Sequence, residues 1–237
     1  MLDVRLAQPD DAEAINRILQ ETWKVSLLFD VFTDHISSPV HKVLVAVKDG
    51  EVAGFLSAFL VSKPMLQWEI DLIVVYATSQ GKGIGTKLIK EALTYGSNLG
   101  AYRAKASIRV DNHASQRAFC KAGFTTDTQV LNLLLWYPLA CEPVSYVPET
   151  VSLIPVDTFI YRGLWIEGFV ESQLSVEEQH SVIHAAQSRI FHEDRSDTGM
   201  FIPESLKHTI TPDLLDSSAD HGQYQHWYYI FKKENGC

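Results

Sequence analysis

Cysteine is scarce in this chain, which has only Cys120, Cys141 and Cys237 among its 237 residues. So few and so scattered cysteines exclude a disulfide framework and a cysteine-based zinc site, and a reducing, cytoplasmic setting is expected. Long apolar runs are also lacking, because none approaches the roughly 18 residues that span a bilayer. The N-terminal segment MLDVRLAQPDD is charged from its third residue. The sequence therefore predicts neither a membrane span nor a secretory signal.

Clusters of Lys and Arg are missing, and this disfavours a nucleic-acid partner, because phosphate binding needs grouped positive charge. The existing charge is divided unevenly. Residues 1–139 carry 14 Lys and Arg against 14 Asp and Glu, whereas residues 140–237 carry 6 against 15 and so hold the whole formal charge of −9. An acidic surface aids solubility, and it would also attract a cationic substrate or partner. The sequence leaves both interpretations open.

Apolar periodicity predicts an α/β arrangement in the first part of the chain. Strands are expected over residues 3–6, 43–47, 52–61, 66–76, 102–110 and 130–137, and helices over residues 9–23, 25–32, 83–100 and 111–124. The strands over 43–47, 52–61 and 66–76 follow one another directly, which predicts an antiparallel meander. The strand over 130–137 is nearly all apolar and is expected to be central.

A break in periodicity from Pro138 to Glu149, which contains three prolines, predicts a linker over residues 140–150, between domains at residues 1–139 and 151–237. In the second domain, strands are expected over 151–154 and 224–231 and helices over 157–171 and 176–191, while residues 192–222 lack a clear pattern. His180, His184 and His192 lie near one helical face, where solvent-exposed histidines are commoner than a metal site. No metal ligands are predicted.

The most specific feature is the segment VVYATSQGKGIGTKLI, in which a strand is followed by a glycine-rich turn and an amphipathic helix. Gly81, Gly83 and Gly85 would let the backbone approach a ligand closely and leave N–H groups pointing outward. The positive end of the helix dipole lies behind them, and Lys82 adds a mobile positive charge. The turn is therefore suited to a pyrophosphate.

Three kinds of phosphate-binding turn can be compared with this segment. The spacing excludes a P-loop. A dinucleotide fingerprint needs Gly-x-Gly-x-x-Gly in a parallel βαβ unit, whereas this turn reads Gly-x-Gly-x-Gly after an antiparallel meander. The segment resembles the third kind, the Gln/Arg-x-x-Gly-x-Gly/Ala signature of the GNAT superfamily of N-acetyltransferases. A glycine-rich turn without a ligand is the remaining alternative.

Other segments resemble the same superfamily. The start DVRLAQPDDAEAINRIL is similar to its first strand and helix, and the stretch from Val110 to Phe124 is similar to its second motif. The resemblance, which covers residues 1–137, implies a mixed, mainly antiparallel sheet flanked by helices. It makes residues 1–139 an acyl-CoA-binding domain. The smaller α+β region over 151–237 would be either a degenerate second GNAT-like half or a substrate lid.

The resemblance implies acetyl-CoA as co-substrate, with no metal. The strand with Ile73, Val74 and Val75 would splay from its neighbour and pair with the pantetheine arm, and the Val75 N–H would bind the thioester carbonyl. The pyrophosphate and the rest of the coenzyme would contact Gln80, Gly81, Lys82, Gly83, Ile84, Gly85, Thr86, Asn112 and Phe119.

Direct transfer requires a neutral amine, so a base must accept a proton. Glu69 and Asp71 are the candidates, because alternation places them on one strand face with Ile73 and Val75. The sequence does not choose between them. Phe119 stands where the superfamily often has a Tyr that protonates the departing thiolate. Cys120, Tyr76 or water would have to replace it.

The sequence thus predicts an acetyl-CoA-dependent N-acetyltransferase that acts on a small cationic amine, such as an aminoglycoside, a polyamine or an amino sugar. It leaves peptide or protein N-termini open as acceptors. The alternative is a CoA-binding sensor or protein-interaction module with weakened catalysis, which agrees with Phe119. Neither a nucleic acid nor a membrane is expected as partner, and a homodimer is left open.

Overall fold

The computed structural model describes residues 2–62, 65–140 and 146–231. It forms two compact units: unit 1 comprises Met1–Thr128 and Gln225–Cys237, and unit 2 comprises Gln129–Tyr224. This division differs from the expected boundaries at residues 139 and 151, because the chain enters unit 2 earlier and returns to unit 1 at its end. Part of the expected linker, residues 141–145, lies outside the described residues.

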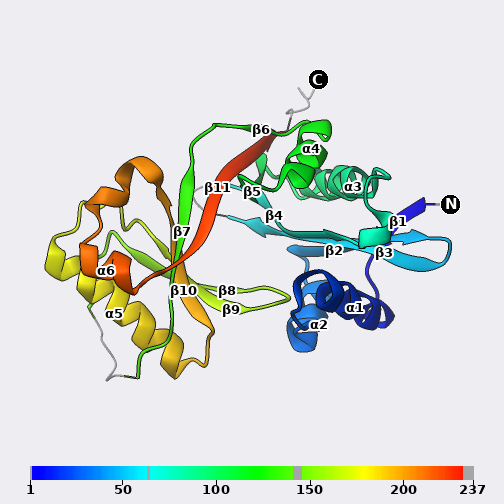
Figure 1. Ribbon diagram of the computed structural model, residues 1–237. Helices are drawn as coiled ribbons and strands as arrows, with labels where there is room; N and C mark the ends of the chain where they lie inside the picture. The colour runs from blue at the N-terminus through cyan, green and yellow to red at the C-terminus, as the bar shows by residue number, and fades with distance from the viewer. Residues whose placement is uncertain (1, 63–64, 141–145, 232–237) are drawn as a thin grey trace. The chain divides into compact units, whose positions relative to one another are not determined.

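Unit 1 is built on a mixed, mainly antiparallel sheet, as predicted. Strands β1, β2, β3 and β4 pair antiparallel in that order, and β5 pairs parallel to β4. Helices α1 and α2 lie on one side of the sheet and α3 and α4 on the other (Figure 1). The elements are β1 (Leu2–Leu6), η1 (Pro9–Asp11), α1 (Ala12–Trp23), α2 (Phe29–Ser37), β2 (His41–Lys48), β3 (Glu51–Val61), β4 (Gln67–Val75), η2 (Ala77–Ser79), α3 (Ile84–Asn98), β5 (Arg103–Arg109), α4 (His113–Lys121) and β6 (Thr125–Thr126).

Helix α3 follows directly from its apolar spacing. Ile84, Leu88 and Ile89 are buried in the core between α3 and the sheet, as the periodicity predicts. Gly96 permits close contact there, because a Cβ at this position would lie 2.7 Å from the Trp68 ring. Trp68 is fully buried, so the glycine and the tryptophan fix how α3 seats on β4.

The last strand of the chain, β11 (Ala219–Ile230), ends in unit 1. Its C-terminal half lies next to β5 in the strand order and pairs with β6. Trp227, Tyr229 and Phe231 pack against the same core as α3. The N-terminal sheet is therefore completed by residues that follow unit 2 in the sequence.

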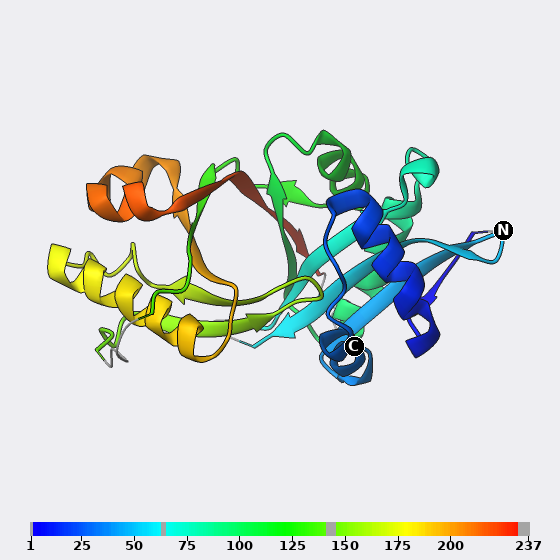
Figure 2. The ribbon, with the colours of Figure 1, turned by 60° about the horizontal axis from the view of Figure 1, so that its bottom comes forward.

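Unit 2 contains strands in the order β8, β9, β10, β7 and the first half of β11. Among these described strands, β9 and β10 run parallel, and the other pairs are antiparallel. Helix α5 lies along one side of these strands (Figure 2, yellow). The elements are β7 (Leu131–Trp136), β8 (Ser152–Asp157), β9 (Arg162–Glu167), α5 (Val176–His192), β10 (Asp197–Pro203), η3 (Glu204–Thr209) and α6 (Pro212–Ser217).

One expectation for this part of the chain was wrong. The helix expected over 157–171 is instead a turn and strand β9, whose Leu164 and Ile166 are buried while Trp165 between them is not. A period of two thus replaces the helical period. Residues 192–222, which lacked a pattern, contain β10, η3 and α6. Strand β7 pairs on both sides, as predicted for a central strand, but in unit 2.

Unit 2 repeats the central part of unit 1. In each, an antiparallel pair (β3–β4 or β8–β9) is followed by a helix and then by a strand parallel to the second strand of the pair. In each, the parallel pairing covers three residue pairs, Gln67–Glu69 with Arg103–Lys105 and Gly163–Trp165 with Asp197–Gly199. This is the arrangement expected of a degenerate second half.

Candidate active site

Strand β4 has a bulge at Asp71. On the neighbouring strand, Ser57 lies opposite Leu72 and Ala58 lies opposite Ile70, so Asp71 is the extra residue. A bulge shifts the alternation of side chains by one position and bends the strand. Even-numbered residues before Asp71 and odd-numbered residues after it therefore point to the same face of the sheet.

Because of the bulge, the side chains of β4 do not share the face that strict alternation predicts. Trp68 before it and Ile73 and Val75 after it all pack in the core with α3. Glu69, which alternates with Trp68, lies on the opposite face of the sheet. The prediction that Glu69 shares a face with Ile73 and Val75 is therefore wrong, whereas Glu69 and Asp71 remain close enough for their charges to interact.

Strands β4 and β5 diverge after three residue pairs. Within these two fully described strands, the pairing ends at Glu69 opposite Lys105. The Tyr76 N–H donates to the Ala53 carbonyl at 2.9 Å. Because hydrogen-bonded and non-hydrogen-bonded pairs alternate in an antiparallel ladder, Val75 opposite Gly54 turns its N–H and C=O away from β3.

The same alternation applies two residues earlier on β4. Ile73, opposite Leu56, also turns its backbone N–H and C=O toward the diverging side, whereas Val74 turns its backbone toward β3 and buries its side chain. The Val75 carbonyl accepts a hydrogen bond from the Gln80 amide at 3.1 Å. The edge toward β5 therefore offers the N–H groups of Ile73 and Val75 to an added extended chain.

The glycine-rich turn has the geometry of an anion site. Gly81 and Gly83 have φ of 72° and 79°, and a Cβ on either would meet nothing within 4 Å. Within the part of the chain that the structure describes, no acceptor is recorded for the six consecutive backbone N–H groups from Gly81 to Thr86. They stand at the positive N-terminal end of α3, as anion binding requires.

The turn is held by its own side chains. The Gln80 amide donates to the Val75 carbonyl, and the Lys82 ammonium donates to the Thr78 carbonyl at 2.6 Å. The Ile84 side chain is buried in the core, so of this residue only the backbone faces the turn. Gln80 therefore ties the turn to the end of β4, and Lys82 ties it to η2.

Two further predicted site residues have structural roles in or beside helix α4. Asn112 caps the helix, and its side-chain oxygen accepts from the Ser115 N–H at 3.1 Å. Phe119 is 2% exposed and packs edge-on against Phe124 in the core. A direct coenzyme contact for either residue remains a prediction. Cys120 and Tyr76 are not buried, and the Tyr76 hydroxyl donates to the Glu21 carboxylate.

The two candidate bases differ in their partners. Glu69 accepts a hydrogen bond from the Gln67 amide at 2.8 Å and lies 3.7 Å from the Lys105 ammonium. Burial raises the pKa of Glu69, although Lys105 and Gln67 oppose this. Among the described residues, no hydrogen bond or ion pair is recorded for Asp71. Its carboxylate is thus available to a substrate.

The pKa of Asp71 is raised as well, to near neutral pH. Burial, and next the negative charge of Glu69, raise the pKa of Asp71 to about 7. A general base works best when its pKa lies near the operating pH. Asp71 thus combines a carboxylate without a recorded partner with a pKa near neutral pH, and the choice between the two carboxyls stays a prediction.

The sequence interpretation missed several polar residues on the face of Glu69. Lys105 and Arg103 alternate with the buried Ala104 on β5, so strand periodicity could have placed them together. Tyr228 and His226 come from β11, far away in the sequence. No local pattern signalled that these residues lie beside β5.

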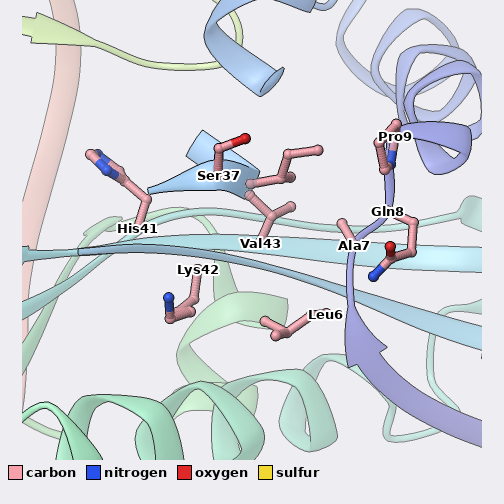
Figure 3. Close-up of a pocket in the computed structure, with 9 residues that line it drawn as sticks. Leu6, Ala7, Gln8, Pro9, Ser37, His41, Lys42 and Val43 are labelled. Carbon is pink, nitrogen blue, oxygen red and sulfur yellow. The ribbon is translucent and has the colours of Figure 1, made fainter. Parts of the chain in front are cut away.

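A separate small pocket of about 270 Å³ lies where the turn after β1, the end of α2 and the start of β2 meet (Figure 3). The His41 ring lines it and stacks on His35 at 4.0 Å between ring centroids. The Lys42 ammonium donates to the Ser38 and Pro39 carbonyls. The lining residues include none of the predicted site residues.

Unit 2 has no counterpart of the glycine turn at its crossover helix. The N-terminus of α5 is closed by a capping box between Ser175 and Glu178, with Glu177 in the same turn. Among the described residues, no cluster of three or more potential metal ligands was found. His180 instead contacts the Asp213 carboxylate and the Val176 carbonyl.

Comparisons with known proteins bear on the identity of the chain. The model of the acetyltransferase (GNAT) family matches residues 12–124. Among curated proteins, none matches the chain. No described helix is long and apolar enough to cross a membrane.

Solved structures give a wider likeness. A GCN5-related N-acetyltransferase from Sphaerobacter thermophilus superposes with a TM-score of 0.63 and 12% identity, covering 97% of this chain and 95% of that one. The PaiA N-acetyltransferase from Thermoplasma acidophilum, in complex with coenzyme A, is 18% identical over 54% of this chain and 91% of that one, with a TM-score of 0.47. An N-acetyltransferase from Staphylococcus aureus Mu50 is 22% identical over 56% and 87%, with a TM-score of 0.48. The first of these shows a GNAT-like fold across the whole chain.

Proposed function

Residues 12–124 of this chain form a domain of the GNAT acetyltransferase family, and on this premise we propose that the protein moves the acetyl group of acetyl-CoA to a primary amine of a small cationic acceptor. The family uses acetyl-CoA. The observation that carries the proposal is the run of six backbone N–H groups without a recorded acceptor, from Gly81 to Thr86, beside the diverging edge of β4.

The residues of this chain fit the co-substrate in two places. The N–H groups of the glycine turn suit a pyrophosphate, and a Cβ at Gly81 or Gly83 would meet nothing within 4 Å, so the space beside these positions is open. The edge of β4 at Ile73 and Val75 suits an amide-containing arm that pairs as a strand does. Acetyl-CoA supplies an activated thioester, whose carbonyl carbon an amine can attack.

The proposed chemistry requires a base and an oxyanion donor from the protein. Asp71 would accept the proton of the attacking amine, because its carboxylate has no recorded protein partner and its pKa is raised to about 7. The Val75 N–H, which points away from β3, would stabilise the negative charge that develops on the carbonyl oxygen. Glu69, 3.7 Å from the Lys105 ammonium, would act on Asp71 through the field of its carboxylate.

Loss of the family tyrosine supports a second candidate function. Phe119 lies in the core and has no proton to donate to a thiolate. A domain that binds acetyl-CoA without turnover would act as a sensor or protein-interaction module. In the acetyltransferase proposal, water takes the place of the missing acid, since a CoA thiolate leaves readily.

The proposal of a cationic acceptor rests on the negative charge of unit 2. Unit 2 carries 14 Asp and Glu against 4 Lys and Arg. Such a field raises the local concentration of cations and speeds their association. A small cationic amine is the proposed partner. A cytoplasmic location, a homodimer and the absence of nucleic-acid, membrane and metal partners remain predictions.

An amine screen that follows thiol release from acetyl-CoA tests this function. Cationic acceptors are expected to react faster than neutral amines of similar size, and added salt should reduce the difference. Binding of acetyl-CoA without thiol release for any amine would favour the sensor instead. The absence of both binding and release would contradict both functions.

A further inference from the structure

The last strand of the chain touches the polar network around the candidate base. The Arg103 guanidinium lies 4.9 Å from the centre of the Tyr228 ring. The Arg103 Nε donates to the Gln67 side-chain oxygen at 2.6 Å, and the Gln67 amide donates to Glu69 at 2.8 Å. One line of contacts thus joins β11 to β5 and to β4.

Each member of this line is limited in its movement. Arg103 is fixed on one side by the ring of Tyr228, a cation–π contact, and on the other by Gln67. Gln67 is 9% exposed, so its amide group has few other hydrogen-bond partners within reach. The Tyr228 hydroxyl also lies 3.3 Å from the His226 Nδ1, a contact that does not involve Arg103.

We propose that Tyr228 is a positioning residue for acetyl transfer: its ring holds Arg103, which through Gln67 holds Glu69 beside Asp71. The inference rests on the proposed function and assigns a role outside residues 12–124, the part of the chain that the family model matches. Strand β11 then contributes to the reaction as well as completing the sheet of unit 1.

The charged groups around Asp71 decide in which direction its pKa is expected to shift when Tyr228 is replaced. Asp71 is influenced by Glu69 on its own strand. Glu69 is influenced by Lys105 and Arg103 on β5, and its charge in turn contributes to raising the pKa of Tyr228 on β11. His226 is neutral near pH 7, because burial, Lys105 and Arg103 lower its pKa to about 3.

Loss of the Tyr228 ring would free Arg103 and loosen Gln67. Glu69 would then keep its proton more readily, since two groups that favour its charged form are displaced. A neutral Glu69 repels the charged form of Asp71 less, so the base would ionise at lower pH. A purely structural role of Tyr228 would not move the pH profile.

The experiment compares Tyr228→Leu with Tyr228→Phe in the full chain. The leucine variant is expected to lower kcat about 10-fold, as a misplaced catalytic group does, and to move the acidic limb of kcat/KM to lower pH. The phenylalanine variant keeps the ring and is expected to retain the wild-type kcat and the wild-type pH profile of kcat/KM. Arg103→Met should reproduce the shift, and the double variant should add little, because both residues act in one line of contacts.

Acetyl-CoA binding separates this inference from the proposed function. If the wild type binds acetyl-CoA and Asp71→Asn abolishes turnover, a wild-type pH profile in both Tyr228→Leu and Arg103→Met overturns the inference alone. Fully additive effects in the double variant would also overturn it. If Tyr228→Leu does not fold, Arg103→Met alone decides the result. Failure of the wild type to bind acetyl-CoA would contradict the function itself.

Discussion

Replacing Asp71 with Asn is expected to make the protein more stable and much less active. The wild-type carboxyl has a pKa of about 7 in the fold against a usual 3.8, because burial and Glu69 disfavour its charge. A carboxyl whose pKa is raised by folding costs stability once it ionises. Asparagine keeps the shape of the side chain and removes that cost.

The magnitude follows from the two pKa values. The difference from 3.8 to about 7 is about 3 units, and at 1.36 kcal/mol per unit it corresponds to at most about 4 kcal/mol at pH 7. The figure is an upper limit, since Asp71 is only partly buried and water reaches part of the side chain. The wild type should lose this stability gradually as pH rises from about 4 to 7. The advantage of Asp71→Asn should therefore grow over the same range and level off above it.

Urea denaturation at several pH values and steady-state kinetics test the two effects together. The variant should gain stability at pH 7 and lose kcat by a factor on the order of 10²–10⁴, the usual contribution of a general base. Asp34→Asn, an exposed change on α2, is the control and should alter neither quantity. A variant that is less stable than the wild type at pH 7, or that keeps the wild-type rate, would refute the reasoning.

Three further outcomes are expected. Glu69→Gln removes the like charge beside Asp71 and should move the acidic limb of kcat/KM to lower pH while turnover continues; an unchanged limb would show that the two carboxyls do not interact. Gly96→Ala places a Cβ 2.7 Å from the Trp68 ring and should lower the free energy of unfolding by about 1–3 kcal/mol. Gly85→Ala in the same helix meets its nearest atom at 3.7 Å and should be neutral or gain up to about 1 kcal/mol, so equal losses in both variants, measured in urea, would contradict the packing argument.

Local chemistry explains why much of unit 1 could be predicted from the sequence. The apolar spacing of Ile84, Leu88 and Ile89 specifies the buried face of α3 without any knowledge of its partner. Gly81 and Gly83 take positive φ, which only glycine adopts at little cost, so their presence at a helix start signalled the turn. Asn112 caps its helix for similarly local reasons.

The bulge at Asp71 could not be predicted, because it depends on how β4 pairs with β3. Buried and half-buried residues alternate along β4 without a break from Trp68 to Val75, and the extra residue becomes visible only in the register with Ser57 and Ala58. The same limit applied to the choice of base. Glu69 and Asp71 look alike in the sequence and differ only through Lys105 and Gln67.

Long-range pairing explains the remaining errors. The return of β11 to unit 1 joins Tyr228 with Thr125, more than a hundred residues earlier in the chain. Strand β9 was mistaken for a helix because its apolar residues also fit a helical period, and short apolar segments are ambiguous in this respect. The domain boundary was predicted too late in the chain because of long-range pairing, since β7 pairs with β10 and so belongs to unit 2.

Calorimetric titration of the full chain with acetyl-CoA tests the central claim most directly. The account predicts binding by the wild type and its loss in Gly83→Glu, which puts a carboxylate among the N–H groups of the turn at a position where a Cβ meets nothing within 4 Å. Gly50→Glu is the matched control, because Gly50 also has a positive φ and open space around it but lies between β2 and β3, so binding should persist. No binding by the wild type, or equal binding by Gly83→Glu, would contradict the assignment of the turn as the coenzyme site.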